Sequence, residues 1–144
     1  MLPQTKTAEH LRISMPASLK EIDQLLPRVM QFFKESSIQT NLFILNYIIR
    51  EGLNNAVLHG SDQDSSKTVI IDVQLSKESL DICIEDEGPG FDWKPLLTRH
   101  LVAPEENHGR GIFCMSKLHF QTSYNDKGNI LYLHKDLTTD HNKE

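Results

Sequence analysis

The sequence is poor in cysteine and lacks any long apolar run. It holds only two cysteines, Cys83 and Cys114, in 144 residues, too few for a disulfide framework or a four-thiolate zinc site. No apolar run approaches the roughly 18 residues that span a bilayer, and the first dozen residues lack the apolar stretch of a signal peptide. We therefore expect a cytoplasmic protein that has no membrane partner.

Positive charge is also in short supply. The chain has 15 Lys and Arg residues against 20 Asp and Glu, a net charge of −5, which argues against direct binding of nucleic acid. Histidine is more frequent, with seven residues, but none has the spacing of a zinc site. The length fits a single domain over residues 1–144, with a core at about 8–137 and a frayed C-terminal tail.

Glycine is scarce, and most of it is paired. Of seven glycines, four form two close pairs, Gly88 with Gly90 and Gly109 with Gly111, and none precedes Gly52. Glycine used in this way indicates backbone that turns sharply or approaches a ligand closely. Two ordinary turns are the alternative.

The hydrophobic periodicity predicts both strands and helices. Apolar residues at helical spacing predict two helices, over 19–36 and 40–60, and a third that opens at Gly111. Pro27 lies inside the first helix, where a kink or a local break is expected, and residues 88–111 read as a long functional loop. Alternating residues predict strands over 9–15, 68–75, 79–87, 119–124 and 129–137.

The order of these elements predicts the fold class. Strands and helices do not alternate as they do in a doubly wound parallel sheet. Short turns join strands 68–75 and 79–87, and likewise the last two strands, which favours antiparallel pairing. We therefore expect an α+β fold, a two-layer sandwich in which helices cover one face of a mostly antiparallel sheet.

The second helix carries the first polar motif. Glu51 and Asn55 are one turn apart on the same face, and His59 continues that line. Carboxylate and amide oxygens suit magnesium and can orient a hydroxyl group. A solvated polar helix face is the alternative.

Two further motifs contain the glycine pairs. Asp86 ends an apolar strand, where its carboxylate could accept hydrogen bonds from an exocyclic amine, while the glycines after it let the chain bend beneath a flat ring; a simple Asp-initiated turn is the alternative. The Gly-Arg-Gly sequence at 109–111 leads into a helix, whose N-terminus attracts phosphate. Arg110 could add charge-assisted bonds there.

The order of the three motifs resembles the ATP-binding domain shared by gyrase, heat-shock chaperones, histidine kinases and mismatch-repair ATPases. Within that superfamily, the chain is most similar to the anti-sigma-factor serine/threonine kinases. The segment EGLNNAVLHG, residues 51–60, matches their helix, DEGPGFD matches their second motif and HGRGIFCM matches their third. The resemblance covers about residues 8–137 and implies a Bergerat-type ATP-binding fold.

The resemblance also implies a role for each matching residue. Glu51 would be the general base that takes a proton from a serine or threonine hydroxyl, and Asn55 would coordinate Mg²⁺. Asp86 would accept a hydrogen bond from the adenine amino group. Asn129 stands where the family often has threonine near adenine, and its amide could bond similarly. The remaining residues expected to contact ATP are His59, Gly88, Gly90, Gly109, Arg110 and Gly111.

The implied protein is an ATP-dependent serine/threonine kinase with ATP and Mg²⁺ as cofactors. It would phosphorylate a small antagonist protein, sequester a sigma factor and form a homodimer. One alternative is an ATP-binding partner-switch module with little or no kinase activity. A histidine-kinase catalytic domain would need a dimerisation helix pair, which the roughly 40 residues before the second helix do not form. A chaperone-type or gyrase-type ATPase would need a longer lid and a transducing domain.

Overall fold

The computed structural model describes residues 8–36, 40–60, 64–88 and 120–137. Strands and helices follow one another in the order strand, two helices, two strands, then two further strands. A π-helical segment directly continues the second helix. The elements are β1 (Ala8–Pro16), α1 (Leu19–Ser36), α2 (Leu42–Asn55), the π-helical segment (Ala56–Gly60), β2 (Thr68–Ser76), β3 (Ser79–Asp86), β4 (Gln121–Tyr124) and β5 (Ile130–Asp136).

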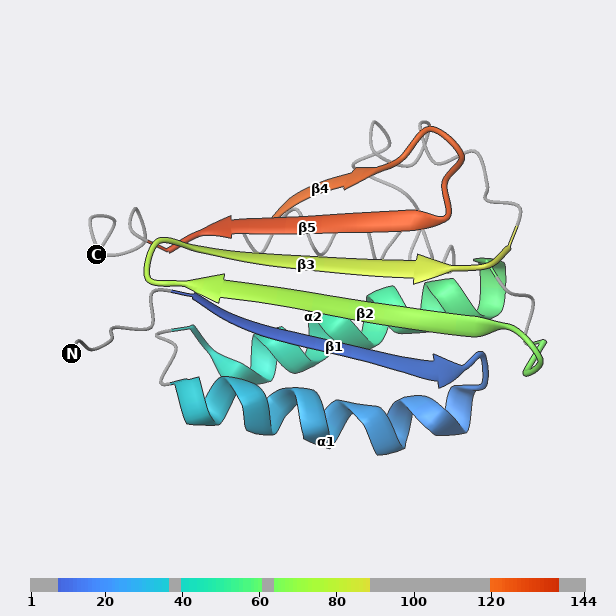
Figure 1. Ribbon diagram of the computed structural model, residues 1–144, viewed down its shortest axis with the longest axis horizontal. Helices are drawn as coiled ribbons and strands as arrows, with labels where there is room; N and C mark the ends of the chain where they lie inside the picture. The colour runs from blue at the N-terminus through green and yellow to red at the C-terminus, as the bar shows by residue number, and fades with distance from the viewer. Residues whose placement is uncertain (1–7, 37–39, 61–63, 89–119, 138–144) are drawn as a thin grey trace.

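The five strands form one sheet in the order β1-β2-β3-β5-β4. Each neighbouring pair is antiparallel, and both helices lie on the same side of the sheet (Figure 1). The predicted two-layer α+β sandwich is therefore confirmed. The strand boundaries differ from the predicted ones by one or two residues at some ends, where pairing and not the apolar pattern decides the boundary.

The core lies between the sheet and the two helices. The alternation predicted for the central strands is present, because Ile71 of β2 pairs with Ile84 of β3 and both side chains are buried. Phe33 of α1 and Leu53 of α2 are fully buried on the helix side. Burying one such side chain stabilises the fold by about 1.5–3 kcal/mol, so this layer supplies a rigid base for the end of the sheet.

Helix α1 runs through Pro27 without a break. A proline inside a helix removes one backbone hydrogen bond and costs about 3 kcal/mol. Pro27 itself is exposed, whereas its neighbours Leu25, Leu26 and Val29 are buried, and their packing outweighs that cost. The local break expected from the sequence at this position does not occur.

Helix α2 begins at an asparagine cap and ends in a wider turn. The Asn41 side-chain oxygen accepts hydrogen bonds from the main-chain N–H groups of Phe43 (2.8 Å) and Ile44 (3.2 Å). The predicted α-helix over 40–60 stops at Asn55, and Ala56–Gly60 is π-helical. Single π turns occur mostly inside α-helices and are frequent at functional sites. This end of α2 is therefore a candidate for part of a functional site.

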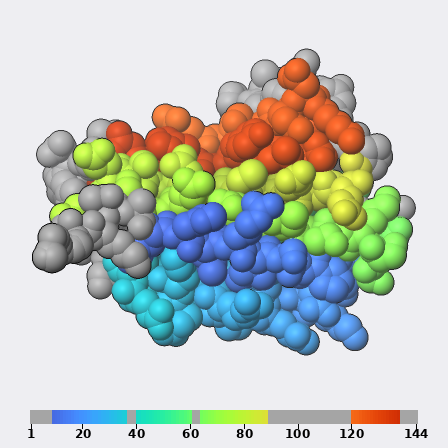
Figure 2. Space-filling model, viewed as in Figure 1, coloured from blue at the N-terminus to red at the C-terminus, as the bar shows by residue number. Residues whose placement is uncertain are grey.

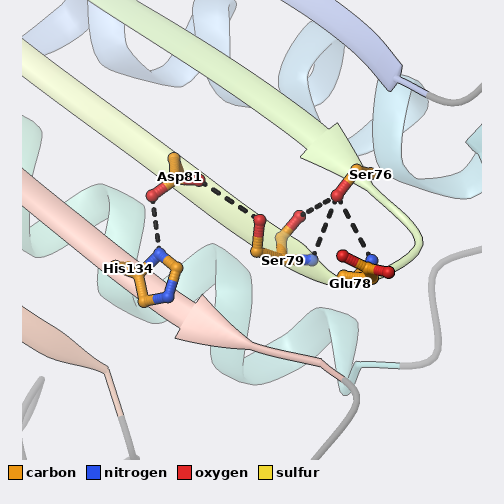
Figure 3. Close-up of polar contacts among 5 residues, drawn as sticks. All are labelled: Ser76, Glu78, Ser79, Asp81 and His134. Atoms are coloured by element: carbon orange, nitrogen blue, oxygen red, sulfur yellow. Dashed lines mark hydrogen bonds and ion pairs between the residues drawn. The ribbon is translucent and has the colours of Figure 1, made fainter.

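The opposite end of the sheet is closed by the turn between β2 and β3 (Figure 3). The Ser76 hydroxyl oxygen accepts the main-chain N–H groups of Glu78 and Ser79, each at 3.2 Å. Further along, Asp81 Oδ1 lies 2.7 Å from Nδ1 of His134 on β5. Antiparallel β3 then carries the chain from this turn to Asp86 at the other end.

In the space-filling view β1 and β2 run side by side above α1 (Figure 2). Polar residues of these two strands alternate with the buried ones and lie on the face of the sheet away from the helices. There Arg12 Nη1 lies 2.9 Å from Asp72 Oδ2, and His10 contacts the same carboxylate at 3.0 Å. Such partly exposed pairs contribute at most about 1 kcal/mol each. Within the described part of the chain, no helix is both long and apolar enough to cross a membrane.

Candidate functional site

Residues from the end of α2, the end of β3 and the β4–β5 turn line a narrow pocket. These three parts of the chain lie at the same end of the sheet (Figure 1). The volume of the pocket is about 10 Å³, room for roughly one water molecule. Three of the residues singled out in the sequence share this pocket, from three different elements. The lining residues are Gly52, Asn55, Ala56, Gly60, Ile84, Asp86, Tyr124, Gly128, Asn129 and Leu131.

Asp86 is the last residue of β3 and is only 5% exposed. The main-chain N–H of Gly88 donates a 2.7 Å hydrogen bond to its Oδ1. Burial raises the pKa of the Asp86 carboxyl group, the bond from Gly88 counteracts this rise in part, and the nearby Glu85 charge adds to it. Asp86 therefore presents an oriented acceptor in poorly hydrated surroundings, where a further hydrogen bond is strengthened.

Two glycines surround the Asp86 carboxylate because no side chain would fit there. A Cβ atom at Gly60 would overlap the carboxylate of Asp86, and one at Gly88 would overlap the main-chain carbonyl of Gly60. Both positions thus require glycine because of close approach. Gly60 closes the π-helical segment, so the wider end of α2 brings backbone directly against the end of β3.

Asn129 holds the main chain of Asp86 from the other side. The Asp86 N–H donates to the Asn129 carbonyl, and the Asn129 side-chain Nδ2 donates to the Asp86 carbonyl, each at 3.0 Å. Asn125 Nδ2 donates in turn to Asn129 Oδ1 at 2.7 Å. The structure therefore brings Asn129 to the predicted site, with its amide engaged by protein groups.

Asn55 contributes an amide whose donor is unused. Its Nδ2 is buried, lines the pocket wall and has no hydrogen-bond partner in the structure as described. An unpaired buried donor costs about 1–3 kcal/mol, and a ligand in the pocket would remove that cost. The same amide offers Oδ1 as a hard oxygen ligand for Mg²⁺, so the residue fits a site for a metal-bound phosphate.

Glu51 and His59 flank this pocket without lining it. Glu51 is half-buried one turn before Asn55 on α2, and His59 is exposed in the π-helical segment. Neither is among the residues that form the pocket wall. The other predicted site residues, Gly90, Gly109, Arg110 and Gly111, lie outside the described residues.

Tyr124 and Asn125 belong to the site but could not be found from the sequence. Tyr124 ends β4 and lines the pocket, where burial and, secondarily, the Asp86 charge raise its pKa well above the ordinary value. Neither residue forms part of a recognisable motif. Only the pairing of β5 with β3 brings their hairpin against Asp86, and that pairing is not encoded locally.

A larger hollow of about 360 Å³ lies on the open face of the sheet, between β2, β3, β4 and β5. Its polar side chains include Asp81 and His134, which already bond to each other. It contains none of the residues predicted to bind ATP. The small pocket, with its unpaired amide and its two obligatory glycines, is therefore the better candidate site.

No three His, Cys, Asp or Glu side chains among the residues that the structure describes lie close enough together to hold a metal ion. Two side-chain amides line the pocket, those of Asn55 and Asn129, and the amide of Asn129 is already bonded to Asp86 and Asn125. A magnesium ion bound with nucleotide takes several ligands from phosphate and water. One protein amide is therefore compatible with a metal that arrives with its phosphates.

The chain matches a family model and several curated relatives over much of its length. The family model of the histidine kinase-like ATPase domain matches residues 15–135. The chain is 26% identical over 147 residues to an anti-sigma F factor of Clostridium perfringens, covering 96% of this chain and 94% of the relative. It is 31% identical over 101 residues to an anti-sigma F factor of Shouchella clausii, covering 64% of this chain and 67% of the relative.

Solved structures share the fold at low sequence identity. The mycobacterial sensor histidine kinase MprB superposes with a TM-score of 0.51 at 18% identity, covering 89% of this chain and 97% of that one. The histidine kinase domain of the blue-light activated kinase EL346 from Erythrobacter litoralis gives 0.52 at 14% identity, covering 97% and 68%. These likenesses establish the architecture of the sheet and helices.

Proposed function

Since this chain belongs to the histidine kinase-like ATPase domain family, we propose that it is an ATP-dependent protein kinase of the anti-sigma-factor type. It transfers phosphate to a serine or threonine of a small antagonist protein and sequesters a sigma factor in the cytoplasm, acting as a homodimer. The observation that carries the proposal is the pocket that joins Asn55 of α2 to the buried Asp86 of β3. Similarity to anti-sigma F factors along 96% of the chain supports the choice of partners.

In this proposal, adenine binds at the Asp86 end. The carboxylate accepts a hydrogen bond from the adenine amino group, and the bare backbone at Gly60 and Gly88 lets the flat ring approach. The pocket has a volume of only about 10 Å³, which is smaller than a purine. In this proposal the residues that line the pocket therefore move apart when the nucleotide binds. The hydrogen bond from the adenine amino group to the Asp86 carboxylate is strong because the site is poorly hydrated.

The phosphates bind at the α2 end. Asn55 Oδ1 would hold Mg²⁺, which when bound neutralises charge on the phosphates during transfer. Glu51 takes the proton from the acceptor hydroxyl as its oxygen attacks the γ-phosphorus, and the bond from that phosphorus to the β,γ-bridging oxygen breaks to release ADP. His59, Gly90, Gly109, Arg110 and Gly111 complete the set of ATP contacts proposed from the sequence.

One observation favours a second candidate, an ATP-binding partner switch without phosphate transfer. Glu51 does not line the pocket that contains Asn55 and Asp86. A module that only binds ATP requires Asp86 and Asn55 but no base. The two candidate functions therefore differ in whether Glu51 acts as a general base.

The test uses labelled γ-phosphate and the proteins that co-purify with the chain. Glu51→Ala and its isosteric control Glu51→Gln should leave ATP affinity within a few-fold and abolish transfer to the partner. Asp86→Asn should instead weaken ATP binding, because a carboxamide N–H₂ would face the adenine amino group. Full phosphotransfer by Glu51→Ala would refute the base assignment. ATP binding by the unaltered chain with no transfer to a confirmed partner would favour the switch.

A further inference from the structure

Asp86 is fixed through its main chain as well as through its side chain. The last register pair between β3 and β5 is Glu85 with Ile130, so the regular ladder stops one residue before Asp86. Asn129 extends it by binding both main-chain polar groups of Asp86, the N–H and the carbonyl, each at 3.0 Å. On the other side, Asp86 pairs with Val69 of β2.

The bond from Asn129 depends on which way its side-chain amide points. Its Nδ2 donates to the Asp86 carbonyl, while its Oδ1 accepts from Asn125 Nδ2 at 2.7 Å. Turning the amide over would place two oxygens against each other at Asp86 and two N–H groups against each other at Asn125. The donor of Asn125 therefore sets the orientation of Asn129.

Asn125 is itself held by the turn between β4 and β5. Its Oδ1 accepts the main-chain N–H groups of Gly128, Asn129 and Ile130, each at 3.0 Å. Gly128 has a φ of 86°, which favours glycine and allows this tight turn. The Asn125 side chain thus accepts three main-chain N–H groups of the turn with its oxygen, and its nitrogen donates the hydrogen bond that orients Asn129.

We propose that Asn125 is a positioning residue for base recognition, which acts through the amide of Asn129 to hold Asp86 where its carboxylate selects adenine over guanine. This inference rests on the proposed function, since it assumes that Asp86 faces the base. Adenine offers an amino donor to the carboxylate, whereas guanine offers an oxygen that the carboxylate repels. Loosening Asp86 should lower the affinity for ATP and leave the weak affinity for GTP nearly unchanged.

The decisive variant is Asn125→Asp. It keeps a side-chain oxygen for the three turn amides but loses the donor to Asn129, so the turn survives while the orientation of Asn129 does not. The ratio of ATP to GTP affinity, measured by calorimetry with Mg²⁺, should fall about fivefold, as expected for the loss of one hydrogen bond. Asp126→Ala, an exposed change in the same turn, is the matched control and should leave the ratio unaltered.

A double-mutant cycle separates positioning from general damage to the fold. In an Asp86→Ala background, Asn125→Asp should change the ATP-to-GTP ratio less than about twofold, because the group that it positions is gone. An unchanged ratio in the single variant, or the same fall in both backgrounds, would overturn the inference. A merely structural role would lower both affinities together.

Amide hydrogen exchange tests the same contacts without nucleotide. In Asn125→Asp, exchange of the Asp86 and Gly88 amides should accelerate about tenfold while the centre of β3 keeps its protection. Unaltered exchange at both amides would refute the link from Asn125 to Asp86. If the unaltered chain binds no ATP, the proposed function and the adenine role fail together, and the exchange data still decide whether Asn125 holds Asp86.

Discussion

The two ends of the pocket differ in how far the protein satisfies its own polar groups. At the Asp86 end, the carboxylate, the main chain and both nearby asparagines have protein partners. At the α2 end, Asn55 carries a buried donor with no partner in the described structure. The difference indicates that the Asp86 end is preorganised, whereas the Asn55 end becomes satisfied when ligand binds.

The largest effect on stability and binding is expected at Gly60, because the Asp86 end of the pocket has no space for a side chain there. Gly60→Ala would drive a methyl group into the Asp86 carboxylate. We expect the free energy of unfolding to fall by about 3 kcal/mol, the upper range for overpacking, and ATP binding to be lost. Urea unfolding and calorimetry would measure the two effects.

The control for Gly60→Ala is its combination with Asp86→Ala. Removing the carboxylate leaves space for the new methyl group, so the double variant should be about as stable as Asp86→Ala alone. ATP binding should stay lost, because the base contact is absent. If the two losses of stability simply add, the close approach of Gly60 to Asp86 is not their cause.

A smaller effect, with opposite signs for stability and binding, is expected at Asn55. Asn55→Ala removes an unpaired buried donor and introduces a strong helix former, so the free energy of unfolding of the ligand-free protein should rise, by up to about 1 kcal/mol. Affinity for ATP with Mg²⁺ should fall about tenfold, or about 1.4 kcal/mol. A marked loss of stability without ligand would show that Asn55 has a structural role.

The neighbouring amide provides the matched control. Asn54→Ala changes the same residue type one position earlier on α2, outside the pocket lining. It should leave the affinity for ATP with Mg²⁺ within about twofold of the unaltered chain. An equal loss of affinity in both variants would mean that the helix, and not the Asn55 amide, carries the effect.

The smallest effect is a pH dependence from Asp86. Burial raises the pKa of this carboxyl group, so its contribution to stability is fully present below the ordinary carboxyl pKa near 4. That contribution is lost as pH rises through the raised value in the folded protein. Asp86→Asn cannot ionise, so its stability relative to the unaltered chain should increase from about pH 4 to pH 7. Urea unfolding at several pH values would test this, and a constant difference would contradict it.

The sequence predicted the two layers and the pocket residues Asn55 and Asp86 because these depend on local patterns. Alternation in β2 and β3 and the helical stripe of α2 decide which faces are buried. Asn55 and Asp86 each lie in a short motif, and the resemblance assigned them to one ligand.

The rest of the site depends on contacts between distant segments. The resemblance placed Asn129 near adenine, but its hydrogen bond to Asp86, across 43 positions of sequence, follows from no local pattern. The π-helical end of α2 was also missed, because residues 56–60 have the spacing of an ordinary α-helix. The need for glycine at position 60 follows from the Asp86 carboxylate at the end of β3, which lies against it only in the folded structure.

The most direct test of the central claim is a crystal structure of the chain with Mg²⁺ and a non-hydrolysable ATP analogue. We predict the adenine amino group within about 3 Å of an Asp86 carboxylate oxygen and the metal within about 2.1 Å of Asn55 Oδ1. A nucleotide bound elsewhere, or one that leaves both side chains without contact, would contradict the account.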